Sequence, residues 1–134
     1  EMQLLIFDLD FFKRVNDTYG HDAGDFILCS VVSLVSEKLR SYDIFARYGG
    51  EEFVIFTTCR QDADLTGFAG RLCSAIRNHQ IDYEDKRLSV TASFGAVQFN
   101  AETSLNDALR FADEALYEAK ANGRDRIAVY SPKI

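Results

Sequence analysis

Residues 42–57 read YDIFARYGGEEFVIFT, two short apolar runs joined by a pair of glycines. Apolar runs of this length, rich in aromatic and β-branched residues, are typical of strands. Adjacent glycines are typical of the tight turn of a β-hairpin, because glycine accepts positive φ. The stretch therefore predicts strands over 42–47 and 52–57 that meet at Gly49 and Gly50, and it favours a sheet that is mostly antiparallel.

Apolar periodicity on either side of the hairpin predicts the remaining elements. Residues 3–7 are a short apolar run, typical of a strand that is buried on both faces. Apolar residues at helical spacing predict the helices, Asp62 is the expected N-cap of one of them, and Ser104 with Asp107 resembles a capping box. The expected order is strand 3–7, helix 11–18 ended by Gly20, helix 22–39, strands 42–47 and 52–57, helix 62–76, strand 87–99 with 81–84 as its candidate partner, helix 104–121 closed by Asn122-Gly123, and strand 126–130.

This order predicts an α/β protein, more narrowly an α+β sandwich in which helices flank one central, mostly antiparallel sheet. A length of 134 residues and 47% hydrophobic residues fit one soluble domain over 1–134. The sequence opens inside its first expected strand, so we expect a domain cut from a longer protein.

Charge and cysteine content narrow the possible partners. Fifteen Lys and Arg against twenty-one Asp and Glu give a net charge of −6, which is unfavourable for general DNA or RNA binding. A single nucleotide can still bind where metal ions and a few cations offset the repulsion.

Cys29, Cys59 and Cys73 form no CxxC pair and are expected to be buried, reduced thiols. No apolar run approaches the roughly 18–20 residues that span a bilayer, so we expect no membrane insertion by this domain.

The stretch LLIFDLDFFK at 4–13 is an apolar strand that ends in two carboxylates. It allows two interpretations of Asp8. One resembles the Asp-x-Asp-Gly-Thr pattern of haloacid dehalogenase phosphatases, with Asp8 as a nucleophile, but Phe11 and Phe12 stand where that pattern needs a hydroxyl. The other makes Asp8 a metal ligand that never reacts. Asp10 is either a second metal contact or the cap of the following helix, and we expect the cap.

Glu51 and Glu52 follow the glycine turn directly. Neighbouring side chains of an extended segment point to opposite faces, so only one of them can join Asp8 from an adjacent strand. Two carboxylates and a backbone carbonyl, such as that of Leu9, would form a hard-oxygen site for Mg²⁺ bound together with substrate phosphates. The alternative is a solvated hairpin tip with charged side chains.

Taken together, these motifs closely resemble the GGDEF-domain family, the diguanylate cyclases, in its GGEEF form. The resemblance rests on FDLDFFKRVNDTYGHDAGD at 7–25, ARYGGEEF at 46–53, TASFGA at 91–96, and ADEALYEAK at 112–120 with Gly123-Arg124. It implies a nucleotidyl-cyclase, palm-like fold with the signature motif on a β-hairpin. It further implies condensation of two GTP into cyclic di-GMP and two pyrophosphates, with Mg²⁺ or Mn²⁺, in a homodimer that the product inhibits.

The resemblance also implies roles for individual residues. Asp8, Glu51 and the Leu9 carbonyl would hold the metal, and Glu51 would act as general base for the attacking 3′-hydroxyl. An RxxD site, Arg40 and Asp43 with Arg71, would bind the inhibitory product. The implied substrate contacts are the Phe11 and Phe12 amides, with both phenyl rings in the core, Lys13, Lys120 and Arg124 at the phosphates, Asn16 and Asp25 at the guanine, and Gly50 on the hairpin.

The sequence departs from the family in two places. The helix with a Leu-Thr-Gly-Leu-type motif that usually precedes the first strand is absent, and Asp125 stands where Asn is common. The resemblance implies an N-terminal sensory or receiver domain in the full-length protein and a cytoplasmic location, including that of a cytoplasmic part of a membrane-bound sensor. A catalytically silent module that only binds GTP or cyclic di-GMP is the alternative, which the intact acidic hairpin disfavours.

Overall fold

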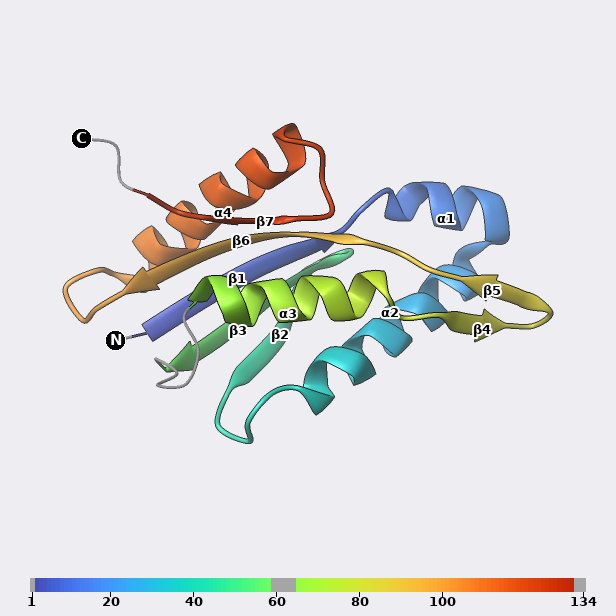
Figure 1. The fold of residues 1–134 in the computed structure, drawn as a ribbon, viewed down its shortest axis with the longest axis horizontal. Coiled ribbons are helices and arrows are strands. Elements are labelled where there is room, and N and C mark those ends of the chain that lie inside the picture. Colours follow the sequence, from blue (N-terminus) through green and yellow to red (C-terminus); the bar gives the residue numbers. More distant parts are fainter. Residues whose placement is uncertain (1, 59–64, 132–134) are drawn as a thin grey trace.

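The computed structural model describes residues 2–58 and 65–131 (Figure 1). Cys59 and the expected N-cap Asp62 lie outside these residues. In the described part, five strands form the central sheet in the order β2-β3-β1-β6-β7, and every neighbouring pair is antiparallel except β6 with β7. Helices cover both faces, so the predicted mixed α/β class with a mostly antiparallel sheet is confirmed. The strands of this sheet are β1 (Met2–Leu9), β2 (Ile44–Gly49), β3 (Glu52–Thr58), β6 (Ala92–Phe99) and β7 (Ile127–Val129).

Strand β1 lies at the centre of the sheet, and its alternate side chains enter two different hydrophobic clusters. Leu5 and Phe7 pack with apolar residues of α2 (His21–Glu37) and α3 (Leu65–Arg77). On the opposite face, Leu4 and Ile6 pack against α4 (Leu105–Ala121). The prediction of a strand buried on both faces is therefore confirmed.

Helix α4 lies directly on the sheet because β6 has no side chain at Gly95. A Cβ atom added there would lie 2.1 Å from the carbonyl oxygen of Ala112 and 2.3 Å from the amide nitrogen of Leu116. The helix begins as expected, since the Ser104 hydroxyl accepts a hydrogen bond of 3.1 Å from the Asp107 amide. This close packing brings the end of α4, with Lys120, to the edge of the sheet where β1 ends.

The predicted β-hairpin forms, although β2 begins two residues later than expected. The expectation that the hairpin glycines adopt positive φ is wrong. In the described part of the chain, the glycines with positive φ are Gly20 and Gly123, not Gly49 or Gly50. Among the described residues, apart from the chain neighbours of each glycine, no atom lies within 4 Å of a Cβ placed at either hairpin glycine. Their lack of a side chain therefore leaves open space beside the turn.

The predicted strand over 87–99 is two strands. β5 (Lys86–Leu88) pairs with β4 (Ile81–Tyr83) in a separate two-stranded sheet, and β6 begins only at Ala92. Directly before β6, the Thr91 carbonyl accepts from the Asp10 amide at 2.9 Å, in line with the pairing of β1 and β6. None of the helices in residues 2–58 and 65–131 is both long and apolar enough to cross a membrane.

Candidate active site

Asp8 lies at the end of β1, opposite Glu52 of β3 and Ser93 of β6. Asp8 is only 9% exposed, and its Oδ2 accepts a hydrogen bond of 2.5 Å from the Lys120 ammonium. Oδ1 is buried and has no hydrogen-bond partner among the described residues. Because a buried carboxylate oxygen without a partner is costly, this atom is a candidate ligand for a cation.

The two hairpin carboxylates lie at different places relative to Asp8. Glu51 occupies the turn, where its carbonyl oxygen accepts from the Leu9 amide at 3.2 Å. Glu52 stands directly across the ladder from Asp8, so both side chains share one face of the sheet. Burial, followed by the negative charges of Asp8 and Asp113, raises the pKa of the Glu52 carboxyl. Sequence reasoning assigned no role to Glu52, and only the strand register identifies it as the neighbour of Asp8.

In the described part of the chain, no three His, Cys, Asp or Glu side chains converge on a point where a metal ion could sit. A site built here would need the Leu9 carbonyl and oxygen atoms from a ligand. Such a donor set suits Mg²⁺, which proteins commonly bind through one or two carboxylates plus substrate phosphates.

Asp10 is not the helix cap that we expected. Helix α1 (Phe12–Tyr19) has Phe11 at its N-cap position, and no side chain caps it. Instead the buried Asp10 carboxylate accepts three hydrogen bonds, from Thr91 Oγ1 (2.7 Å), Ser93 Oγ (2.7 Å) and the Asp125 amide (2.9 Å). Asp10 therefore ties the turn after α4 to the start of β6.

Asp125, which had no predicted role, holds the same turn from the other side. Its carboxylate accepts from Arg77 Nε at 2.9 and 3.0 Å. Its φ of 48° lies in the left-handed region, which Asp and Asn adopt more readily than most residues. This turn carries Arg124, so Asp10 and Asp125 together set the place of that guanidinium.

The two phenylalanines after Asp10 differ in environment. Phe12 is buried, as predicted, but Phe11 is 51% exposed, so the expectation that both rings pack in the core is wrong. The Phe11 ring lies between the guanidinium groups of Arg14 and Arg124, at 4.6 and 4.8 Å from its centroid. Because the first amides of a helix have no intrahelical acceptor, the Phe12 and Lys13 amides lie beside these cations as open donors.

Asn16 and Asp25 come from neighbouring helices, α1 and α2. The Asn16 carboxamide packs on the helical residue Gly24, where an added Cβ would lie only 1.9 Å from Asn16 Oδ1. Asp25 follows in the chain and is exposed. The structure thus brings Asn16 beside the turn of α2 that carries Asp25. Gly24 was missed from the sequence, although a glycine inside a helical pattern is a signal for close packing.

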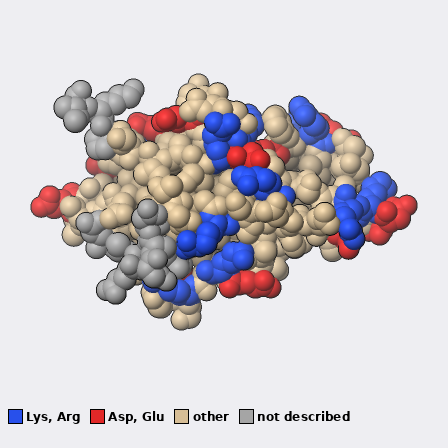
Figure 2. Space-filling model, in the orientation of Figure 1, with Lys and Arg blue, Asp and Glu red and all other residues tan. Residues whose placement is uncertain are grey.

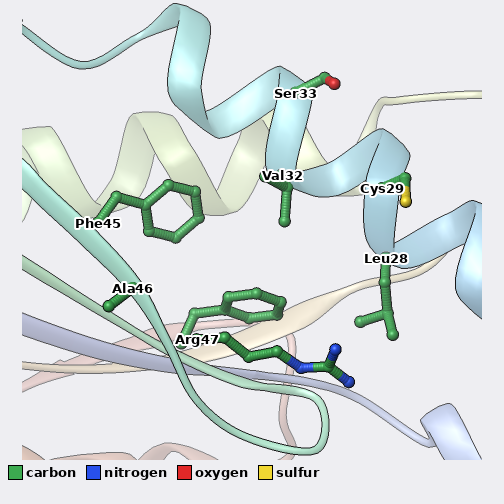
Figure 3. Close-up of a pocket in the computed structure, with 8 residues that line it drawn as sticks. Leu28, Cys29, Val32, Ser33, Phe45, Ala46 and Arg47 are labelled. Atoms are coloured by element: carbon green, nitrogen blue, oxygen red, sulfur yellow. The ribbon is translucent and has the colours of Figure 1, made fainter.

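A cavity of about 410 Å³ lies between α2 and the hairpin strands (Figure 3). Arg47 donates from Nε to the Gly50 carbonyl at 2.7 Å and so closes the hairpin turn. Cys29 lies on the cavity wall and is exposed, so the expectation of a buried thiol is wrong for Cys29 and correct for Cys73. The lining residues are Leu28, Cys29, Val32, Ser33, Phe45, Ala46, Arg47 and Phe53.

The RxxD residues meet at the opposite end of β3. Arg40 Nη2 donates to Asp43 Oδ1 at 3.1 Å, and the Arg40 amide donates to Oδ2 at 2.8 Å. Burial alone would raise the pKa of Asp43, but hydrogen bonds from Thr57 and Arg40 outweigh it and lower this pKa below its usual value. Within residues 2–58 and 65–131, no hydrogen bond or ion pair joins Arg71 to this pair. Arg71 lines an open groove of α3 together with Lys38, two residues before Arg40.

Comparison with known proteins agrees with this arrangement. Residues 1–126 match the family described as "Diguanylate cyclase, GGDEF domain". The chain is 38% identical over 129 residues to Diguanylate cyclase A of Treponema denticola, which covers 96% of this chain and 35% of that protein. This chain therefore spans about a third of the length of the curated relatives that it matches.

Two solved structures are similar over nearly the whole chain. The GGDEF domain of DgcB from Caulobacter crescentus, in complex with c-di-GMP, has a TM-score of 0.89 at 27% identity and covers 98% of this chain and 76% of that one. The active GGEEF domain of a diguanylate cyclase from Vibrio cholerae has a TM-score of 0.86 at 28% identity and covers 98% and 84%. The chain belongs to the GGDEF-domain family of diguanylate cyclases.

Proposed function

We propose that this chain is the catalytic domain of a diguanylate cyclase, which condenses two GTP into cyclic di-GMP and two pyrophosphates. The observation that carries the proposal is the Asp8 carboxylate beside the acidic hairpin: Lys120 binds one of its oxygens, and the other has no partner within residues 2–58 and 65–131. The relatives named diguanylate cyclase support the same reaction.

Asp8, Glu51 and the Leu9 carbonyl would hold Mg²⁺ or Mn²⁺, and Glu52 lies across from Asp8 to add negative charge. When bound, the ion supplies positive charge that stabilises the phosphate oxygens during transfer. Glu51 takes the proton of the 3′-hydroxyl as it attacks.

The cations at the start of α1 and the end of α4 bind the triphosphate. Lys120 and Arg124 neutralise phosphate charge, and the Phe11, Phe12 and Lys13 amides with the Lys13 ammonium complete the cradle. Gly50 leaves the space beside the hairpin free for the nucleotide.

Asn16 and Asp25 read the guanine edge. The amide donates to O6, and the carboxylate accepts from N1–H and the exocyclic amine. Adenine presents the opposite pattern of donors and acceptors at these positions, so this pair favours GTP over ATP.

One domain offers one half of the reaction site. Each 3′-hydroxyl attacks the α-phosphate of the other GTP, and the two-fold symmetry of the product requires two domains that face each other in a homodimer. Arg40, Asp43 and Arg71 bind the product and inhibit the enzyme. In the full-length protein, an N-terminal sensory or receiver domain controls this pairing, and the domain works in the cytoplasm, also where the sensor is membrane-bound.

We expect no DNA or RNA partner. The net charge is −6, and on the face drawn in Figure 2 acidic and basic side chains lie side by side instead of forming one broad basic surface. Counterion release, which drives nucleic-acid binding, needs such a surface.

Incubation with GTP and Mg²⁺, followed by separation of the nucleotides, tests the proposal. We expect cyclic di-GMP from the wild type, none from Glu51→Gln, and wild-type yield from Glu118→Gln, a matched change of an exposed glutamate on α4. GTP binding without product in the wild type would instead identify a catalytically silent binding module. Product formed by strictly monomeric protein, at a rate per protein that does not depend on its concentration, would contradict the dimer.

A further inference from the structure

Thr57 lies near the end of β3 and is only 1% exposed, although its side chain is polar. Its hydroxyl oxygen accepts a hydrogen bond of 2.5 Å from Arg40 Nη2 and donates one of 2.5 Å to Asp43 Oδ1. A hydroxyl has a single proton and two lone pairs, so the two bonds are compatible. Both join the hydroxyl to a charged group, which makes them stronger than bonds between neutral groups.

Further contacts hold one edge and one face of the Arg40 guanidinium. Nη2 also donates to the Thr58 carbonyl at 3.2 Å, and the Tyr42 ring lies 4.5 Å from the guanidinium carbon. The Asp43 side chain is fully buried, whereas that of Arg40 remains 28% exposed. Asp43, Thr57 and the Thr58 carbonyl thus hold the guanidinium, while its exposed part remains open to a ligand.

The pairing of β3 with its neighbouring strand does not require the Thr57 hydroxyl. Across the ladder, the register partner of Thr57 is Gln3, a buried residue whose amide atoms have no partner in the part of the chain that the structure describes. Apart from a long contact of 3.2 Å with the Thr58 carbonyl, the partners of the hydroxyl among the described residues are Arg40 and Asp43. A valine of the same shape would suit a buried strand equally well.

We infer that Thr57 is a positioning residue of the product-binding site, whose hydroxyl fixes Arg40 and Asp43 in the geometry that binds a guanine of cyclic di-GMP. The inference rests on the proposed function, in which this pair binds the product. Without the hydroxyl, the arginine and the aspartate stay paired within their own turn, but the guanidinium loses its strongest tie to the sheet. A ligand must then order the arginine itself, which weakens its affinity.

Calorimetric titration of cyclic di-GMP tests the inference. A saturating, non-hydrolysable GTP analogue with Mg²⁺ keeps the product out of the active site. We expect Thr57→Val to weaken product binding about tenfold to a hundredfold, the range for loss of a hydrogen bond to a charged group. Thr57→Ser, which restores the hydroxyl, binds within about threefold of wild type on the same scale. Thr58→Val is the matched control, because the hydrogen bond from Arg40 reaches the Thr58 backbone carbonyl, which this change keeps.

The variants separate this inference from the proposal on which it rests. If Arg40→Ala binds cyclic di-GMP as tightly as wild type, the proposed product site itself is wrong. If Arg40→Ala loses the product while Thr57→Val retains it, only the role of Thr57 is overturned. Equal weakening by Thr57→Val and Thr57→Ser also overturns it, as does loss of GTP-analogue binding together with product binding. Failure of both Thr57→Val and a second variant, Thr57→Ala, to fold would overturn it too, since the fold would then need the hydroxyl.

Discussion

The Lys120 ammonium donates to Oδ2 of Asp8 at 2.5 Å, although 112 residues separate the two in the chain. The contact joins the last turn of α4 to the end of β1. Oδ1 of the same carboxylate has no partner in the part of the chain that the structure describes, so one side chain presents a neutralised and an open oxygen to a ligand.

Replacement of Lys120 should impair turnover more than folding. In Lys120→Gln, Asp8 keeps a polar neighbour but loses the positive charge beside the phosphates. We expect kcat/KM for GTP to fall about tenfold to a hundredfold, the range for a lost charge-assisted hydrogen bond. Lys86→Gln, a change of an exposed lysine on β5, is the control. Turnover that is equal in the two variants would remove Lys120 from the site.

Asp10 should stabilise the fold, because it accepts hydrogen bonds from three partners while buried. In Asp10→Asn the new NH₂ group faces donors instead of acceptors, and the charge opposite Arg124 is lost. We expect the free energy of unfolding in urea to drop by about 2–4 kcal/mol. Asp85→Asn, at a side chain that is 89% exposed, should change it by less than about 0.5 kcal/mol. A similarly small change in Asp10→Asn would contradict a stabilising role of these three hydrogen bonds.

Gly24→Ala should weaken nucleotide binding through Asn16. The new methyl group would lie 1.9 Å from Asn16 Oδ1, so the carboxamide must move away from its place beside α2. We expect GTP affinity to fall by about tenfold, with a smaller preference for GTP over ATP, as for loss of a hydrogen bond that discriminates the base. Gly70→Ala on α3 has open space around the new methyl and serves as the control. Unchanged nucleotide preference in Gly24→Ala would contradict a base-reading role of Asn16.

Gln3→Leu should stabilise the protein. Gln3 is 1% exposed, and both polar atoms of its amide lack partners among residues 2–58 and 65–131. Leucine has a similar volume and avoids the cost of a buried amide, so we expect the free energy of unfolding to rise by about 1–2 kcal/mol. Gln80→Leu, at an exposed residue, should leave it nearly unchanged. A loss of stability in Gln3→Leu would show that the amide is satisfied.

The Arg40–Asp43 pair should make stability depend on pH. The pKa of Asp43 is lowered in the folded state, because the hydrogen bonds from Thr57 and Arg40 outweigh the effect of burial. Its contribution is therefore complete above the unfolded pKa of about 3.9 and is lost as the pH falls through the folded value. The difference in unfolding free energy between wild type and Asp43→Asn should be larger at pH 7 than at pH 3.5. Equal differences at both values would contradict the lowered pKa.

The sequence predicted what depends on local periodicity. The apolar run of β1, the capping box at Ser104 and the glycine turn each specify a structure within a few residues of themselves, and all three are present. The element order and the mixed α/β class follow from such local patterns.

What the sequence did not reveal depends on distant partners. The carboxylate of Asp10 is bound by groups 81, 83 and 115 residues away, so nothing near it distinguishes a cap from a structural anchor. The strand that periodicity predicts as continuous over 87–99 is divided because its first part, β5, pairs with β4 and not with the central sheet. Phe11 is exposed because its partners are two arginines, and one of them, Arg124, follows only after α4.

Strand β3 carries Glu52 at one end and Thr57 at the other, about 17 Å apart at the usual rise of a strand. The two positions differ by five, an odd number, so Glu52 faces the side of α4 and Thr57 faces the opposite side. A slip of β3 by one residue against β1 would therefore turn both side chains to the wrong face at once. Catalysis and its feedback control thus share a single alignment of two strands, and no misregistered form of this domain can keep one without the other.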